Sequence, residues 1–343
     1  MKPPFFLVAL MSGVLALSVL SPAEAAASNK SAKTVKTNKA VQSKSVAKTA
    51  VRAKKRVAIK TSVRKAAQGA SAVDDAAGLA LDSKGNPILK SSAFYVANQE
   101  TGEVLLEKNG GAVLPIASIT KLMTAMVVLE ASPSLSEELT IDEEDIDQIK
   151  GTGSRLSVGT RLTREQMLQL ALMSSENRAA SSLARHYPGG VAAFVNAMNI
   201  KARLLSMSDT HFYDSTGLNP ANVSSPRDLA RLVAAAARYP LIREFSTTAE
   251  RYVDVKGRQL RFGNTNSLVK NPDWEIGVSK TGYISEAGRC LVMQAWINRK
   301  PFVIVLMDSA GRYTRTADAQ RVRKWMDLQS AERVAAASKA RQG

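Results

Sequence analysis

PIASITKLMTAMVVLEA, residues 115–131, places a lysine near the start of a run that is otherwise almost entirely apolar. After Lys121 no polar face remains to meet water, so the pattern predicts a helix that lies buried. Residues three apart share one face of a helix, so Ser118 and Lys121 would bring a hydroxyl next to an amine. A hydroxyl beside a neutral amine can become a nucleophile.

The Ser-x-x-Lys spacing is weak by itself. A lysine in an apolar helix usually runs its stem along the surface and keeps its ammonium in water. The setting of Ser118 and Lys121, and the motifs that follow them, must therefore decide between a solvated lysine and a catalytic one. The same spacing occurs elsewhere at Ser45/Lys48, Ser62/Lys65 and Ser267/Lys270.

Two short motifs downstream favour the catalytic interpretation. Ser175-Glu-Asn177 follows a predicted helix, Lys280-Thr-Gly282 ends a predicted strand, and each pattern occurs once in the chain. Ser-x-x-Lys, Ser-x-Asn and Lys-Thr-Gly in this order are the motifs of penicillin-binding proteins and class A β-lactamases. Glu176 replaces the usual aspartate of the middle motif, which matters little because only the outer two residues should face the site. The three motifs together predict an acyl-transfer site.

The predicted catalytic roles follow from what each group can do. Ser118 would attack a carbonyl carbon, for which it needs a base beside it at neutral pH. Lys121 can be that base only when neutral, and burial together with a second cation at Lys280 would both lower its pKa. Ser175 is placed to pass a proton toward the leaving amine. Asn177 would hold the substrate backbone.

Substrate contacts are expected from the strand motif. Lys280 and Thr281 would bind a substrate carboxylate, and Gly282 would let the strand lie close to the substrate. The oxyanion would accept hydrogen bonds from the backbone N–H groups of Ser118 and Tyr283.

The pattern of elements predicts an α+β fold, in which a largely antiparallel sheet is flanked by helices and a helical lobe. Thr163 to Gln166 forms a capping-box pattern, and Ser225 before Pro226 is typical of a helix start. Strands are expected at 92–97, 102–108, 252–255, 275–280, 289–297 and 302–307, and helices at 115–131, after 163, before Gly189, at 191–205, after 225 and at 314–328.

The N-terminus is typical of an exported protein. Lys2 precedes an apolar run of 16 residues from Phe5 to Leu20, and Ala23-Glu-Ala25 suits a signal peptidase. We expect residues 1–25 to be removed and the protein to lie in the periplasm. A membrane anchor is the alternative, but the run is short for a span. Cys290, the one cysteine, cannot form an internal disulfide and should be a buried apolar residue.

Residues 26–73 carry most of the formal net charge of +17, with thirteen Lys or Arg and no acid. Lys2 and Glu24 cancel, so about +4 remains for the rest of the chain. This composition predicts a basic disordered arm or linker, which either contacts envelope polyanions loosely or acts as a plain spacer. Export argues against nucleic acid as a partner. The catalytic domain is expected over 74–328 and a polar tail over 329–343.

Competing chemistries find little support. His186 and His211 are the only histidines, and no Gly-x-Ser-x-Gly elbow accompanies them. Neither histidine has a partner at metal-ligand spacing, so we expect both to be structural and the site to use no cofactor and no metal.

Over about 74–328 the sequence resembles the low-molecular-mass penicillin-binding proteins, most closely the penicillin-binding protein 7 type of D-alanyl-D-alanine endopeptidase. The resemblance implies the penicilloyl-serine transferase fold, peptidoglycan as substrate and covalent acylation by β-lactams. It also implies that the site consists of Ser118, Lys121, Ser175, Asn177, Lys280, Thr281 and Gly282. The matching stretches are 115–125, 172–180, 279–290, 216–219 and 222–225.

The resemblance leaves open which bond is cut. Carboxypeptidase relatives usually carry a further β-rich domain and an anchor helix, whereas only about fifteen residues follow Leu328 here. We therefore expect an endopeptidase that hydrolyses D-alanyl-meso-diaminopimelate cross-links through an acyl-enzyme on Ser118. A D-alanyl-D-alanine carboxypeptidase is the alternative. The third hypothesis is a β-lactamase, for which no deacylating carboxylate can be assigned. The fourth is a non-catalytic wall-binding or β-lactam-sensing protein.

Overall fold

The computed structural model describes residues 73–74 and 79–340. The predicted signal peptide and nearly all of the basic arm lie outside the described residues. All described residues belong to one compact unit.

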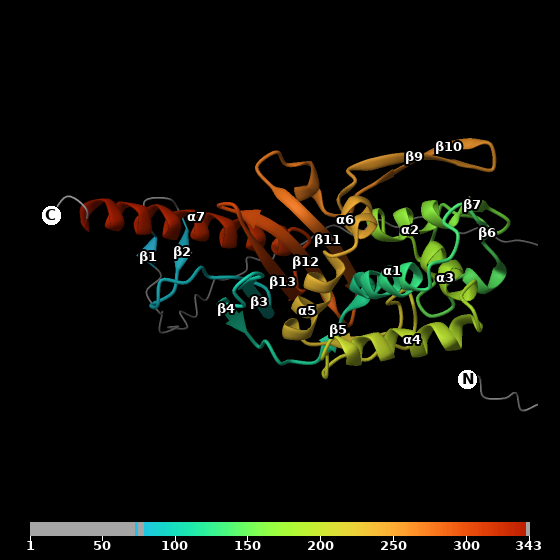
Figure 1. Cartoon of the computed structure of the whole chain (residues 1–343), viewed down its shortest axis with the longest axis horizontal. Coiled ribbons are helices and arrows are strands. Elements are labelled where there is room, and N and C mark those ends of the chain that lie inside the picture. The colour runs from blue at the N-terminus through green and yellow to red at the C-terminus, as the bar shows by residue number, and fades with distance from the viewer. Residues whose placement is uncertain (1–72, 75–78, 341–343) are drawn as a thin grey trace, which may run out of the picture. The chain divides into compact units, whose positions relative to one another are not determined.

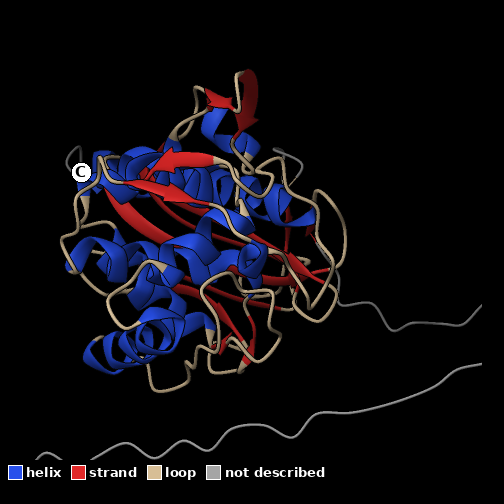
Figure 2. Ribbon diagram, turned by 90° about the vertical axis from the view of Figure 1, so that its right-hand side faces the viewer, coloured by secondary structure: helices blue, strands red, loops and turns tan. Residues whose placement is uncertain are grey.

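A five-stranded antiparallel sheet with strand order β11-β12-β13-β3-β4 forms the centre of this unit. Helices lie on both sides of it (Figures 1 and 2). The sheet strands are β3 (Ala93–Asn98), β4 (Val104–Lys108), β11 (Glu275–Ile284), β12 (Gly288–Ile297) and β13 (Lys300–Ser309).

The remaining elements connect or cover the sheet. The helices are α1 (Thr120–Glu130), α2 (Arg164–Met173), α3 (Asn177–Arg185), α4 (Gly190–Leu204), α5 (Pro226–Ala236), α6 (Pro240–Thr247) and α7 (Thr314–Ala340), with short 3-10 helices η1 (Ala117–Ile119), η2 (Glu143–Asp145) and η3 (Ser267–Lys270). Two-stranded pairs are formed by β1 (Val73–Asp74) with β2 (Ala80–Leu81), β5 (Leu114–Pro115) with β8 (Val223–Ser224), β6 (Glu138–Thr140) with β7 (Arg161–Thr163), and β9 (Glu250–Val255) with β10 (Arg258–Gly263).

Both faces of the sheet are covered, and each packs in its own apolar core. Successive side chains of a strand point to opposite faces, so one strand contributes to both cores. On β13, Val303, Val305 and Met307 pack with the helical lobe, whereas Ile304 and Leu306 pack in a second core with α7. This explains the nearly continuous apolar runs of β12 and β13, which alternation alone would not predict. The α+β fold class is confirmed.

Helices α2 and α5 begin where local capping signals place them. Thr163 Oγ1 accepts a hydrogen bond from the Gln166 backbone N–H, and Gln166 Oε1 accepts one from the Thr163 N–H, which completes the predicted capping box. Ser225 caps α5 in the same way, with Pro226 in the first turn. Helix α1 is buried along nearly its whole length, as its sequence predicts.

The ends of two elements differ from the expectation. Strand β11 does not end at Lys280 but continues to Ile284, because Tyr283 and Ile284 pair with Arg289 and Gly288 of β12. Helix α7 continues past Leu328 to Ala340. The pattern also missed α6 and β10, which are only eight and six residues long.

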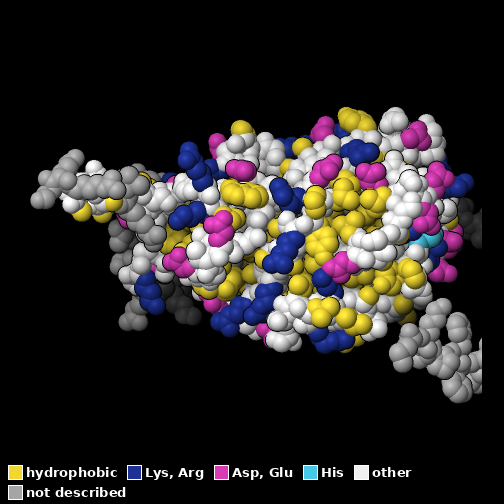
Figure 3. All heavy atoms as spheres, viewed as in Figure 1, with side chains coloured by type: hydrophobic (Ala, Val, Ile, Leu, Met, Phe, Trp, Pro, Cys, Tyr) yellow, Lys and Arg dark blue, Asp and Glu magenta, His cyan; other side chains and the backbone are white. Residues whose placement is uncertain are grey.

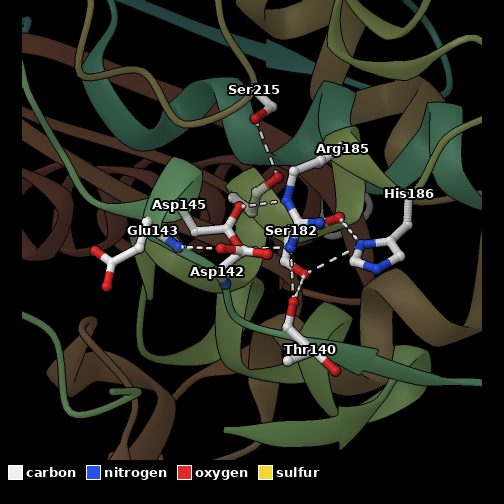
Figure 4. Close-up of polar contacts among 9 residues, drawn as sticks. Thr140, Asp142, Glu143, Asp145, Ser182, Arg185, His186 and Ser215 are labelled. Carbon is white, nitrogen blue, oxygen red and sulfur yellow. Dashed lines mark hydrogen bonds and ion pairs between the residues drawn. The ribbon is translucent and has the colours of Figure 1, made fainter. Parts of the chain in front are cut away.

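A polar network ties η2 to α3 within the lobe (Figure 4). Arg185 Nη2 lies 2.9 Å from Asp145 Oδ2 and donates to the Thr140 carbonyl at 2.7 Å. His186 Nδ1 lies 2.8 Å from the Ser182 carbonyl, one turn back on α3. His186 is therefore a structural residue of this network, as predicted.

The surface drawn in Figure 3 intersperses basic, acidic and apolar side chains. This mixture is consistent with the small excess charge that remains outside the basic arm. None of the described helices is long and apolar enough to cross a bilayer.

Candidate active site

Ser118 and Lys121 meet where η1 passes into α1. Lys121 is completely buried, which removes the interpretation of a lysine that reaches water. Its Nζ lies 2.9 Å from Ser118 Oγ, 2.7 Å from Asn177 Oδ1 and 2.6 Å from the Thr216 carbonyl oxygen. The first and second motifs therefore converge on one nitrogen atom.

These three neighbours suit a neutral amine as well as an ammonium, whose three N–H groups could donate to all of them. Two of them, Asn177 Oδ1 and the Thr216 carbonyl, can only accept, and a neutral amine has two N–H groups to donate to them. The lone pair then remains for the proton of the Ser118 hydroxyl. This arrangement is the one in which Lys121 can act as a base toward Ser118.

Burial lowers the pKa of Lys121 to about 7, against the opposing effect of the Asp214 and Glu176 carboxylates. Burial removes the water that would solvate an ammonium, so the charged form is disfavoured. A large fraction of the amine is consequently neutral near physiological pH.

A second buried pair, Lys280 and Ser175, joins β11 to the segment between α2 and α3. Lys280 Nζ donates to Ser175 Oγ at 2.9 Å and to the Thr281 carbonyl at 2.9 Å. Burial, followed by the charges of Lys121 and Arg315, holds the pKa of Lys280 well below its usual value. The sheet motif and the lobe motif are thus in direct contact across the site.

Close backbone approaches fix the position of Ser118. A Cβ on Gly282 would lie 2.8 Å from the Ile116 carbonyl oxygen and 3.2 Å from the Ser118 nitrogen. A Cβ on Gly217, whose φ is +81°, would lie 1.9 Å from the Ala117 carbonyl oxygen. Only glycine fits at either position, so β11 and the 214–222 loop both press against the backbone that carries the serine.

Two of the non-glycine residues with positive φ lie at the same place. Ala117 has φ = +47° and Ser175 has φ = +63°, the left-handed region that non-glycine residues rarely adopt. Each costs of order 1–3 kcal/mol and persists only where surrounding contacts impose it. Here the strained residues are the one before Ser118 and the partner of Lys280.

Several contributors were not predicted. Thr152 Oγ1 accepts from Asn177 Nδ2 at 3.0 Å and so orients that amide. Asp214 holds the loop that supplies the Thr216 carbonyl by accepting from the Gly217 N–H and from Asn222 Nδ2, both at 2.8 Å. Residues 216–219 and 222–225 carried a family signal, but a carbonyl that holds Lys121 could come from any residue type.

The groove beside Ser118 has a volume of about 540 Å³ and extends from the nucleophile to the start of α7. Thr281 Oγ1 donates to Thr265 Oγ1 at 2.7 Å within it. Arg315 Nη1 donates to the Gly282 carbonyl at 3.1 Å. Its walls are formed by Ser118, Thr152, Ser175, Asn177, Leu218, Thr265, Ser267, Thr281, Gly282, Tyr283, Arg289, Arg312, Tyr313, Arg315 and Thr316.

The structure brings the predicted site residues together. Ser118, Ser175, Asn177, Thr281, Gly282 and Tyr283 line the groove, and Lys121 and Lys280 lie buried beneath it.

Cys290 is buried, and burial raises the pKa of its thiol to about 11. His211 packs against Tyr213 and pairs with Val223. Among the described residues no group of three His, Cys, Asp or Glu is arranged to hold a metal ion.

A serine whose hydroxyl faces a buried, largely neutral lysine, in a groove bounded by a sheet edge and a helical lobe, defines a serine acyl-transfer enzyme of the penicilloyl-serine transferase fold. The chain belongs to the peptidase S11 family, D-alanyl-D-alanine carboxypeptidase, whose family model matches residues 80–311. It is therefore a serine peptidase.

Similar proteins support this assignment. The chain is 49% identical over 254 residues to a D-alanyl-D-alanine endopeptidase of Pseudomonas aeruginosa and 46% identical over 254 residues to one of Escherichia coli; each match covers 74% of this chain and 82% of the relative. The crystal structure of the Streptomyces K15 DD-transpeptidase superposes with a TM-score of 0.65 at 28% identity, over 70% of this chain and 97% of that one. The ampicillin-bound penicillin-binding protein D2 of Listeria monocytogenes gives a TM-score of 0.60 at 29% identity, over 70% of this chain and 98% of that one.

Proposed function

We propose that the protein is a serine DD-endopeptidase that hydrolyses D-alanyl-meso-diaminopimelate cross-links of peptidoglycan. The observation that carries the proposal is the position of Lys121 Nζ, 2.9 Å from Ser118 Oγ and held by two obligate acceptors. The choice of an endopeptidase is supported by the names of the relatives at 49% and 46% identity.

The reaction begins with attack of Ser118 Oγ on the D-alanyl carbonyl while Lys121 accepts the hydroxyl proton. The oxyanion is stabilised by the backbone N–H groups of Ser118 and Tyr283. Ser175, which accepts a hydrogen bond from Lys280, passes a proton to the leaving amine and regains one by transfer of the proton that Lys121 took from Ser118. Water then hydrolyses the acyl-enzyme.

Substrate is positioned by the two walls of the groove. Lys280 and Thr281 bind the carboxylate next to the scissile amide, and Asn177 holds the substrate backbone. Gly282 keeps β11 close to Ser118, since any side chain there would collide with the backbone at residues 116–118. A β-lactam carries a carboxylate near its reactive amide and would acylate Ser118 in the same pose.

Purified protein incubated with cross-linked muropeptide dimers, and separately with monomer pentapeptide, tests the proposal by product mass. We expect dimers to be converted to monomers, with loss of this activity in Ser118→Ala and after penicillin treatment. A Ser118→Ala variant that still cleaves dimers would overturn the assignment of the nucleophile.

Carboxypeptidase activity is the second candidate, because the matching family model is described as D-alanyl-D-alanine carboxypeptidase. Loss of only the terminal D-alanine from the pentapeptide, with dimers intact, would establish it. A non-catalytic wall-binding or β-lactam-sensing protein would bind penicillin but turn over neither peptide.

The place of action follows from the N-terminal sequence. We infer export with cleavage after Ala25 and action in the periplasm, where peptidoglycan lies. The mass of the N-terminal peptide of the cellular protein tests this inference: a peptide beginning at Ala26 is expected, and one that retains residues 1–25 would contradict it.

A further inference from the structure

Three arginines gather at the end of the groove where β11, β12 and α7 meet. Arg289 stands opposite Tyr283 in the β11–β12 register, and Arg312 and Arg315 lie on either side of the first residue of α7. All three line the same groove as Ser118. A site that holds an anion next to the reacting amide therefore continues into a strongly basic region.

This cluster has no acidic partner among the described residues. Most other arginines with buried or half-buried surroundings form carboxylate pairs, for example Arg164 with Glu137 and Arg185 with Asp145. Arg289 instead lies over the Tyr283 ring at 4.4 Å, and Arg312 over the Tyr313 ring at 5.5 Å. Stacking orients a guanidinium without neutralising it, so its donors stay available for an anion.

Arg315 lies closer to the Lys280-Thr-Gly282 motif than Arg289 and Arg312 do, so we call it the inner arginine and the other two the outer arginines. Arg315 donates to the Gly282 carbonyl, within the Lys280-Thr-Gly282 motif, and its charge lowers the pKa of Lys280. Arg315 therefore belongs with the groups that meet the carboxylate adjacent to the scissile amide. Arg289 is half-buried and Arg312 is exposed, and neither side chain forms a hydrogen bond with the Lys280-Thr-Gly282 motif. The N-terminus of α7 adds favourable potential for an anion at this end.

The two candidate substrates differ in charge on the amine side of the scissile bond. A terminal D-alanine leaves with one carboxylate. The amine released from a cross-link is a whole second peptide stem, which bears further carboxylates beyond the one next to the amide. On the amine side of the scissile bond, only the cross-link can therefore occupy cations that lie outside the inner carboxylate site.

We propose that Arg289 and Arg312, stacked on Tyr283 and Tyr313, form an anion subsite that binds carboxylates of the amine-side stem and makes the enzyme prefer cross-links to free D-alanyl termini. This proposal rests on the proposed DD-peptidase function and names the part of the substrate that selects between its two reactions.

The test compares kcat/KM for the muropeptide dimer with kcat/KM for the monomer pentapeptide in Arg289→Gln, Arg312→Gln and the double variant. Loss of two partly exposed charge-assisted contacts should lower the dimer-to-pentapeptide ratio about tenfold in the double variant, and salt should weaken the wild-type preference. Arg299→Gln is the matched control, because exposed Arg299 follows the opposite end of β12 and should leave the ratio unchanged.

A binding readout separates failure of this inference from failure of the proposed function. The free tetrapeptide monomer, which is the amine-side product, should slow acylation of wild-type Ser118 by fluorescent penicillin, and the double variant should need about tenfold more of it. If wild type cleaves no dimer but shows this difference in protection, the endopeptidase proposal fails and the subsite stands. Equal losses on dimer and pentapeptide, an unchanged ratio, or equal protection of both proteins would overturn the subsite.

Discussion

Lys121 sets the pH at which Ser118 can react. Because burial lowers the pKa of Lys121 to about 7, its neutral fraction rises as pH rises through that value. We expect the rate of β-lactam acylation to increase about tenfold per pH unit below pH 7 and to level off above it, if the neutral amine is the base. Stopped-flow measurements with a penicillin that does not titrate between pH 5.5 and 8.5 check this. A flat profile over that range would exclude neutral Lys121 as the required base.

Glu176, the departure from the usual middle motif, tunes that pKa. It is buried, pairs with Arg155 at 3.2 Å and raises the pKa of Lys121. Glu176→Gln removes the negative charge and leaves Arg155 unpaired, so both changes should move the rising limb of the acylation profile to lower pH. Glu138→Gln, in an exposed pair with Arg161, is the control. A limb that stays in place or moves to higher pH would contradict the electrostatic role of Glu176.

Comparison of Gly217 with Gly257 distinguishes two reasons for a glycine: lack of space for a Cβ atom and a positive φ. Gly217 and Gly257 both have φ near +80°, but a Cβ on Gly257 meets nothing within 4 Å, whereas one on Gly217 would overlap the Ala117 carbonyl. Gly257→Ala should cost about 1 kcal/mol of unfolding free energy. Gly217→Ala should cost about 3 kcal/mol or more and slow acylation, because the backbone before Ser118 must move. Denaturant titration and penicillin-binding rates measure both, and equal costs would show that the collision is relieved elsewhere.

At the scale of elements, one buried carboxylate of α7 binds the segment that leads into β3, in addition to the apolar packing of the helix against the sheet. Asp318 accepts from the Ser91 N–H at 2.8 Å and the Ser91 hydroxyl at 2.7 Å, and pairs with Arg321 at 2.7 Å. Asp318→Ala would leave these donors unpaired and should lower the unfolding free energy by about 3 kcal/mol. Asp327→Ala, which removes a half-exposed partner 3.7 Å from Arg323 on the same helix, should change it by less than about 0.5 kcal/mol. Similar losses in both variants would show that Asp318 does not anchor the helix.

Elements with strong local chemistry were predictable from the sequence, and contacts made by tertiary register were not. The capping box at Thr163 and the apolar run after Lys121 each specify a helix through neighbours a few residues away. The extension of β11 past Lys280 depends instead on pairing with Arg289, and no local pattern reports it.

The site divides in the same way. Ser118, Lys121, Ser175, Asn177 and Lys280 carry side-chain chemistry that a motif can record. The Thr216 carbonyl reaches Lys121 only because Asp214 and Gly217 shape a distant loop. Arg289 reaches the groove through the pairing of β12 with β11, and Arg312 and Arg315 reach it because α7 starts beside β11. Sequence reasoning therefore predicted side chains that the structure brings together, and missed much of what positions them.

At the scale of the whole molecule, most of the net charge lies outside the compact unit that contains the site. Residues 26–73 hold thirteen cations and no acid, and about +4 remains elsewhere, whereas the compact unit that contains the site comprises residues 66–343. Chemistry and surface attachment should therefore be separable.

A variant that lacks residues 26–65 should keep kcat/KM on soluble dimers within about twofold, since no residue of the groove is removed, and should lose binding to anionic vesicles. Each Lys or Arg near an anionic surface contributes about 1 kcal/mol, which salt screens within roughly a Debye length, so full-length binding should weaken steeply between low and physiological salt. Replacing the Lys and Arg of this segment by Gln at constant length isolates charge from length. Vesicle co-sedimentation and dimer turnover measured on the same preparations decide the matter. Vesicle binding that survives the Gln replacement would show that the charges of the arm do not attach the protein, which would leave the arm as a spacer. Dimer turnover that falls in the Gln variant would mean that the arm presents substrate to Ser118.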